Sequence, residues 1–472
     1  MNGVMIGIIV YIALQLLVGF LVSRNVKTEQ DYLVGGRKLG LLMATLTIFA
    51  TWFGSETCLG SAGATYKEGI SGNAGDPFGY SLCLILMGLF LAVPLWKRGL
   101  TTIGDLYRTR FDSVTEKVAV LIMVPTSILW AAAQIRGFGT VLGSVSTDWD
   151  IEATTTMAAA VVIIYTASGG LLADAWTDLI QGFVLIAGLV VLFAVVMASG
   201  DAPALDTLPP ERLSLMTDKD TFWSFAERWA VPLFGSVIAA ELISRVLAAR
   251  SPQVARRSAL MAGGVYLLIG LIPIYLGLIG ARMFPGLEDS EQVLIVHAQH
   301  HFHDFFYIVF AGAIVSAILS TVDTTLLTAG SLTAHNVVLP LMKAPSERTR
   351  LLVNRGLVVA SGIAAYLYAL EAESVSETVE EASSLGSAGI FVTIVFGLFT
   401  GFGGRWAAIS SLVLGLAAYL LLTYWSRWGM EAVVGEFEAA NYPYLCSLAT
   451  AFSAYVLAGI RERKSPANPA TV

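Results

Sequence analysis

Charged residues are scarce in this sequence. Only 13% of its 472 residues are charged and 56% are hydrophobic, whereas an ordinary soluble domain carries roughly 25% charged residues. The mean hydropathy is correspondingly high, at +0.72. A soluble protein of this length needs far more charge to cover its surface, and a disordered chain needs more still. The composition therefore indicates an all-α integral membrane protein with many helices.

Cysteine and the motifs of several function classes are also missing. The three cysteines, Cys58, Cys83 and Cys446, are too far apart to form a disulfide framework or a zinc site. The net charge of −7 says little about nucleic acid, but no basic face exists to bind it, so a nucleic-acid partner is not expected. No GxxxxGK[ST] loop supports ATP-driven pumping, and no HExxH or GxSxG motif supports an enzyme.

Long apolar runs, in contrast, fill the chain. A hydrocarbon core about 30 Å thick requires about 20 apolar residues per helix. The first run is not expected to be a cleaved signal peptide, because it lacks a basic start. We expect thirteen membrane spans, at roughly 3–23, 40–64, 77–98, 116–143, 152–170, 172–199, 221–247, 258–282, 303–335, 351–371, 383–401, 404–424 and 442–460.

The positions of the basic residues predict the orientation in the membrane. Lys and Arg concentrate in cytoplasmic loops. An external N-terminus and a cytoplasmic C-terminus place 21 of the 28 basic residues on the cytoplasmic side. We therefore expect a multi-pass protein of the plasma (cytoplasmic) membrane. The basic segments are 24–39, 97–117, 245–257, 343–355, Arg405 and 461–464.

Two of the expected spans are interrupted by glycine or proline. Gly54 lies within 40–64, and Pro232 and Gly235 lie within 221–247. Each interrupted span begins a block of five helices, and the blocks run in opposite directions, as in an inverted repeat. The alternative is ordinary glycine at helix contacts. The expected organisation is an N-terminal helix and loop (1–39), repeat A (40–199), an external loop (200–220), repeat B (221–401) and two C-terminal helices with a tail (402–472).

Polar side chains gather inside two of the apolar runs. Ser320, Thr321, Asp323 and Thr324 fall within 303–335, and Asp178 lies inside 172–199. Oxygen ligands without Cys or His suit an alkali cation. Hydroxyls that bond back to their own helix are the alternative, but this does not account for Asp323.

Several motifs together resemble the sodium:solute symporter family. They are residues 31–37 (DYLVGGR), 165–173 (YTASGGLLA), 176–181 (WTDLIQ) and 244–248 (SRVLA). Residues 50–52 (ATW), 79–82 (GYSL) and 130–133 (WAAA) look like the choline-transporter branch of that family. The resemblance implies a five-plus-five inverted-repeat core of the amino acid–polyamine–cation transporter type, which works by alternating access with sodium as the coupling ion.

The resemblance also implies positions for the sodium ions. The main site would use backbone oxygens and two hydroxyls, from Ala50, Phe53, Ala317, Ser320 and Thr321. A second site, found in some members, would use Asp178, Ser320, Asp323 and Thr324.

An aromatic cage for a quaternary amine is implied only in part. Trp52, Tyr80 and Trp130 match three of its positions, and the fourth is Ala239; Gly235, at the break nearby, is a further candidate contact of the solute. Cation–π attraction depends on enclosing the charge, so three aromatic walls do not establish choline as the solute.

Three charged residues at membrane depth are further candidates for binding the solute. Glu56 and Glu241 lie beside the two breaks, and Arg136 follows Trp130. Glu56 with Arg136 would suit a zwitterion such as an amino acid or a betaine. Alternatively, Glu241 pairs with Arg245 one turn later, and Arg136 reaches the outer interface.

Four histidines form a cluster before the expected span 303–335. His297 and His301 have the i,i+4 spacing that can hold zinc, and His300 and His303 lie beside them. The alternative is a solvated external segment or a pH-responsive lid.

Together these features predict sodium-coupled symport of a small organic solute: an amine, a zwitterion or a choline-like cation. A proton-coupled symporter that uses Asp178 or Asp323 as carrier is the nearest alternative. A sodium-permeable channel is less consistent, because the breaks lie within one chain. The expected partners are the solute and the lipid bilayer. A monomer would suffice for transport, and an oligomer remains open.

Overall fold

The computed structural model describes residues 26–144, 149–218, 220–425 and 438–464, with scattered positions between 6 and 21. Most of the predicted first span, 3–23, lies outside these residues. The α-helices of the described part are α2 (Glu29–Val34), α3 (Leu41–Trp52), α4 (Ser61–Glu68), α5 (Tyr80–Leu86), α6 (Ala92–Lys97), α7 (Gly104–Arg110), α8 (Ser113–Gly143), α9 (Ile151–Gly169), α10 (Leu171–Ser199), α11 (Phe222–Ala230), α12 (Ala240–Ala248), α13 (Pro252–Met283), α14 (Val293–His301), α15 (Asp304–Leu332), α16 (Glu347–Glu371), α17 (Val375–Ser384), α18 (Ser387–Phe399), α19 (Arg405–Thr423) and α21 (Pro443–Lys464).

Many of these helices have the length and composition of membrane spans. In the described ranges, 8 helices qualify, or up to 10 if each of two bent pairs forms one span. The prediction of an all-helical membrane protein is therefore confirmed. The predicted span 383–401 begins too late, because α17 and α18 form a bent pair at 43° that starts at Val375.

Both predicted interruptions are present. The first helix of its span, α3, ends at Trp52, and the chain resumes helical hydrogen bonding only after Phe53 and Gly54. In the second, α11 continues through residues 231–238, and Ala239 then adopts an extended conformation before α12, with a bend of 43°. Irregular backbone of this kind is tolerated at membrane depth only where protein or a cavity surrounds it.

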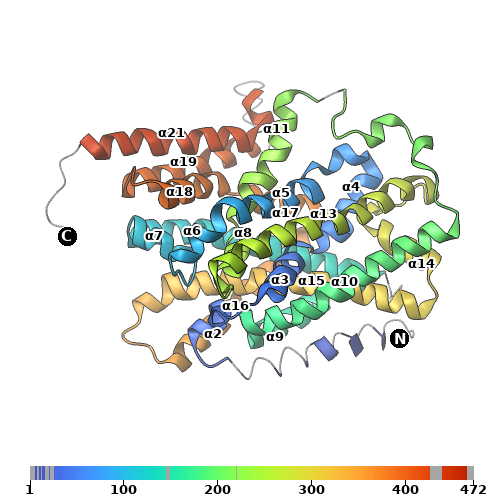
Figure 1. Cartoon of the computed structure of the whole chain (residues 1–472), viewed down its shortest axis with the longest axis horizontal. Helices are drawn as coiled ribbons and strands as arrows, with labels where there is room; N and C mark the ends of the chain where they lie inside the picture. Colours follow the sequence, from blue (N-terminus) through green and yellow to red (C-terminus); the bar gives the residue numbers. More distant parts are fainter. Residues whose placement is uncertain are drawn as a thin grey trace.

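The centre of the molecule is α15. Every residue from Phe310 to Leu332 on this helix is buried, and a helix that is apolar on all sides belongs in a core. Figure 1 shows α15 among α3, α8, α10 and α16, while α18, α19 and α21 stack at one edge. The polar run of α15 is therefore enclosed by other helices and does not face lipid.

An ionic cluster links four segments at one end of the molecule, called here the α7 end: α2, α7, α16 and Thr333–Val338. Glu29 of α2 accepts a hydrogen bond from Arg350 of α16 at 2.6 Å and contacts His335 at 2.9 Å. The second ring nitrogen of His335 lies 3.3 Å from Asp105 of α7. Burial opposes ionisation of Glu29, but its bonds with His335 and Arg350 outweigh this and hold the pKa of its carboxyl below the usual value. The cluster therefore stabilises the packing of the α7 end.

Close packing of α13 against α4 gives a test of this architecture. A methyl group on Gly277 of α13 would collide with the backbone oxygen of Ala62 and would lie 3.0 Å from Thr65 Cβ. We expect Gly277→Ala to lower stability by about 1–3 kcal/mol through overpacking, measured as a lower melting temperature in detergent. Gly264→Ala on the same helix is the control, because its new methyl group would meet no atom within 4 Å. Equal melting temperatures for the two variants would contradict the packing.

Candidate functional site

The break in α3 lies against the polar run of α15. The hydroxyl of Thr321 lies 3.4 Å from the backbone oxygen of Ala50 and 3.2 Å from that of Ala317. Phe53 follows the last residue of α3 with φ −92° and ψ 67°, outside the helical region. The structure therefore brings together three of the five predicted ligands of the main sodium site, Ala50, Ala317 and Thr321, at the end of a helix.

Ser320 connects this group to α10. Its hydroxyl donates to one oxygen of Asp178 at 2.5 Å, and Thr47 of α3 donates to the other oxygen. Ser320, Asp178 and Thr321 are all fully buried. Ser320 therefore lies between the two predicted sodium sites, and in this structure it is bonded to Asp178 of the second site.

The second predicted site contains a guanidinium group that the sequence analysis did not place there. Arg245 of α12 forms an ion pair with Asp174 and also bonds to the hydroxyl of Thr324. It lies 3.7 Å from Asp178. A positive charge belonging to the chain therefore shares the space expected for a second sodium ion.

Asp323 completes this buried cluster. One of its oxygens accepts a bond from Thr166 at 2.5 Å, and the other has no hydrogen-bond partner among the residues that the structure describes. Asp174, Asp178 and Asp323 face one arginine, Arg245. When all four are ionised, the cluster keeps a net negative charge, which favours a further cation or a proton.

The helix pair of Glu241 with Arg245, the alternative to a solute role for Glu241, is not formed. Arg245 turns toward α10, and Glu241 accepts a hydrogen bond from Ser127 of α8 at 2.5 Å. The i,i+4 spacing allowed the pair, but two aspartates on a neighbouring helix give Arg245 a more strongly negative environment. This sequence interpretation is wrong.

Glu56 lies just after the α3 break and is held by two side chains of α8. Trp130 donates its indole N–H at 3.2 Å, and Gln134 donates its amide at 2.7 Å. The Trp130 ring meets Trp52 edge to face, with centroids 5.0 Å apart at 88°. Two of the three predicted aromatic walls, Trp52 and Trp130, are therefore adjacent, and they lie beside a buried carboxylate.

A cavity of about 360 Å³ reaches Glu56 from the end of the molecule opposite α7, called here the α14 end. Tyr80, the third predicted aromatic residue, also lines it. Six acidic residues line this cavity against two basic ones, and one of the two, Arg228, is paired with Asp220 at 2.8 Å. This acidic cavity is lined by Glu56, Glu68, Asp76, Glu291, Glu377 and Glu380, with Lys67 and Arg228.

The remaining predicted solute residues lie elsewhere. A separate cavity of about 30 Å³ is lined by Gly235, Ala239 and Glu241, and also by Trp130. Trp130 therefore stands between the two spaces, since it also bonds to Glu56. Within the described ranges, Arg136 lines neither of these cavities.

Sequence reasoning missed Asp76, which lies at the edge of the expected span 77–98. Its carboxylate accepts bonds from Thr57 at 2.7 Å and from Tyr266 at 2.9 Å. Tyr266 also donates to the backbone oxygen of Trp52 at 3.2 Å. An acidic residue directly before an apolar run was the available signal. These bonds tie α13 to the α3 break and add a second carboxylate to the acidic cavity.

Interrupted helices, oxygen ligands beside the break and an acidic cavity near the middle of a helical membrane protein define a secondary transporter. The chain belongs to the sodium:solute symporter family, whose family model matches residues 32–415. It is accordingly a sodium-coupled symporter of a small organic solute.

Individual relatives are distant but cover most of the chain. High-affinity choline transporter 1 of Drosophila melanogaster is 26% identical over 93% of this chain and 72% of its own length. The human protein of the same name is 28% identical over 87% of this chain and 75% of its own length. High-affinity proline transporter PutP of Bacillus subtilis is 24% identical over 89% of this chain and 92% of its own length.

Solved structures show the same fold. A sodium-coupled sialic acid symporter in a substrate-bound outward-open state matches with a TM-score of 0.78 at 18% identity, covering 98% of both chains. Mhp1, a nucleobase-cation-symport-1 family transporter in a closed conformation, matches with a TM-score of 0.62 at 13% identity, covering 92% of this chain and 94% of that one. The predicted transporter fold is thereby confirmed.

Gly54 offers a test of the contact between the two parts of the site. A methyl group here would lie 2.7 Å from both Thr321 Oγ1 and Gln134 Oε1 and would also collide with Glu56. We expect Gly54→Ala to remove most of the rise in melting temperature that NaCl produces over KCl at equal ionic strength. A ligand that binds only the folded state raises stability by RT ln(1 + [L]/Kd), so a lost ion site loses this rise.

Gly182→Ala on α10 is the matched control. Its methyl group also faces α3 but meets Leu46, Phe49 and Ala50 at ordinary distances of 3.7–3.8 Å. An unchanged sodium effect in Gly54→Ala would show that the α3 break is not part of the ion site.

Proposed function

We propose that the solute is a small organic cation, an amine, which enters the acidic cavity and pairs with Glu56. The carrying observation is the position of this carboxylate at the inner end of a cavity lined by six acidic and two basic residues. A cleft of one charge sign concentrates solutes of the opposite sign. Trp130, which bonds to Glu56, adds an aromatic surface beside the charge.

Both the comparisons and the cavity support an amine. The relatives named above are described as transporters of choline and of proline, and both molecules carry a charged nitrogen. A zwitterion also needs a cation for its carboxylate. Arg136, the sequence candidate for this role, does not line the cavity, Arg228 is already paired with Asp220, and Lys67 is exposed to solvent. The lining therefore favours a cation over a zwitterion.

For the coupling ion, we propose the main sodium site at Ala50, Phe53, Ala317, Ser320 and Thr321. Support comes from the approach of Thr321 to the backbone oxygen of Ala50 on α3, whereas its bond to Ala317 is an ordinary i−4 bond within α15. Ser320 donates its proton to Asp178 and keeps its lone pairs, so its hydroxyl could ligate sodium and bond to Asp178 at the same time.

We also propose a second cation at Asp178, Asp323 and Thr324, which would take the place of the Arg245 guanidinium there. Thr324 is bonded to Arg245, so the guanidinium must release it before an ion can bind there. Proton coupling is the second candidate function. It is favoured by one observation, the oxygen of buried Asp323 that has no partner in the described part of the chain. Uptake that follows the pH gradient without sodium would select this alternative.

We also propose that the α7 end faces the cytoplasm. The basic segments 97–117 and 245–257 support this orientation through the positive-inside rule. The acidic cavity then opens to the exterior. Because one chain supplies all of these residues, a monomer suffices for transport, in the plasma membrane.

Substitution of Thr321 tests the sodium site. We expect Thr321→Ala to raise the NaCl concentration for half-maximal thermal stabilisation at least fivefold, because one oxygen ligand is removed. Thr325→Ala, one turn further along α15, is the control. Thr325 is also buried, but its hydroxyl bonds only to its own helix at Val322. A sodium dependence that is equal in the two variants would contradict the assignment.

Substitution of Glu56 tests the solute site. We expect amines such as choline to raise the melting temperature only when sodium is present, and Glu56→Gln to lose at least nine-tenths of this rise. Gln has the same shape without the charge and keeps one acceptor oxygen, so it can retain one of the two hydrogen bonds from Trp130 and Gln134. Glu68→Gln, an exposed acid of the same cavity, should retain the effect. Equal behaviour of the two variants would remove Glu56 from the solute site.

A further inference from the structure

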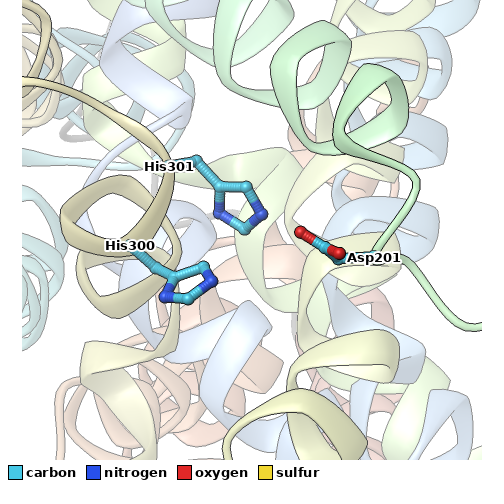
Figure 2. Close-up of side chains that lie close together, drawn as sticks. All are labelled: Asp201, His300 and His301. Carbon is cyan, nitrogen blue, oxygen red and sulfur yellow. The ribbon is translucent and has the colours of Figure 1, made fainter.

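A group of three side chains at the α14 end has the composition of a transition-metal site. Asp201 follows the end of α10, and His300 and His301 are the last two residues of α14. One potential ligand atom from each lies within 4.8 Å of the others. Figure 2 shows the two imidazole rings on one segment and the Asp201 carboxylate on the segment facing them.

The hydrogen bonds of His301 leave it ready to bind a metal. Its Nδ1 lies 2.9 Å from the backbone oxygen of His297, which can only accept, so Nδ1 carries the proton. The other nitrogen, Nε2, then presents a lone pair and has no hydrogen-bond partner in the described ranges. A metal-binding histidine is commonly fixed by such a bond from its second nitrogen.

His297 is not part of this group, although the i,i+4 spacing suggested a pair with His301. Its side chain is fully buried, and Nε2 lies 3.0 Å from the backbone oxygen of Leu276. The ring of His300 packs edge to face against two other rings, that of Phe284 at a centroid distance of 5.4 Å and that of His301 at 4.8 Å. The partner of His301 in the group is therefore His300 and not His297, which the spacing had suggested.

The backbone also favours a cation at this place. Both α10 and α14 end beside the group, and the C-terminal end of a helix carries a partial negative charge of about −0.5. Two imidazoles and one carboxylate match the ligand set of zinc in many sites. Donor atoms about 2.0–2.1 Å from a tetrahedral zinc ion are about 3.4 Å apart, so modest side-chain rotation closes the group.

We propose that Asp201, His300 and His301 form an external site for a divalent transition metal. The bound ion is Zn²⁺, and a water molecule is its fourth ligand. The metal would join the end of α10 to α14. These helices lead to the ion-binding region, because α10 carries Asp178 and α14 is followed directly by α15.

An effect of the metal on transport follows from this connection, and it rests on the proposed function. Alternating access requires helices to move relative to one another. A metal bridge between α10 and the segment preceding α15 restrains that movement, so Zn²⁺ inhibits transport from the exterior.

Binding is tested by titrating ZnCl2 into the chelator-treated full-length protein in detergent and following the heat. One saturable site is expected, with Asp201→Asn and His300→Ala each weakening it at least tenfold. His303→Ala is the matched control, an exposed histidine two residues beyond the group. CaCl2 should give no comparable binding, because two of the three ligands are nitrogens.

Several outcomes would overturn the site. They are the absence of saturable Zn²⁺ binding, equal weakening by His303→Ala, or unchanged affinity in both Asp201→Asn and His300→Ala. Calcium binding as tight as that of zinc would contradict the nitrogen ligands. Melting temperatures measured without metal should match the unmodified protein, because Asp201 and His300 are exposed.

Inhibition is tested separately, by sodium-driven uptake of choline into proteoliposomes with and without external ZnCl2. A decrease that disappears in Asp201→Asn is expected. Zinc binding without any effect on uptake would show that the metal does not restrain the movement of α10 relative to α14. Saturable zinc binding by a protein that takes up neither choline nor proline would instead count against the proposed function, while the metal site stands.

Discussion

The break between Trp52 and Ser55 is the feature on which the rest of the site depends. At membrane depth, backbone groups released from a helix must find partners within the protein. Here the end of α3 lies against α15, where Thr321 approaches the backbone oxygen of Ala50. Gly54 permits this contact, since a side chain there would collide with Thr321 of the proposed ion site and with Glu56 of the proposed solute site. The same short segment therefore joins the proposed sodium ligands to Glu56.

The scarcity of charge gives each buried charge a large effect. In the region around α15, Asp174, Asp178 and Asp323 outnumber Arg245, and the acidic cavity is lined by more acids than bases. Both regions therefore favour cations, which suits the proposed binding of sodium and an amine together. Hydrogen bonds from Ser320, Thr166 and Gln134 stabilise the buried carboxylates of Asp178, Asp323 and Glu56.

Sequence reasoning predicted the features that depend on local patterns. Hydropathy located the helices, glycine and proline located the breaks, and a run of hydroxyls located the centre of α15. Contacts between distant segments were not predictable in the same way. Arg245 pairs with Asp174, 71 residues away, where helical spacing offered Glu241. Asp201 meets His300 only because α10 and α14 end side by side. Neither pairing leaves a periodic signal in a single sequence.

The central claim is that a sodium gradient drives uptake of a small organic cation. Its most direct test is uptake of choline, with proline as the zwitterionic comparison, by the purified protein in proteoliposomes under separate sodium and proton gradients. The account predicts accumulation of choline with an inward sodium gradient at equal pH, and loss of accumulation when potassium replaces sodium. Accumulation driven by a proton gradient in the absence of sodium would contradict it.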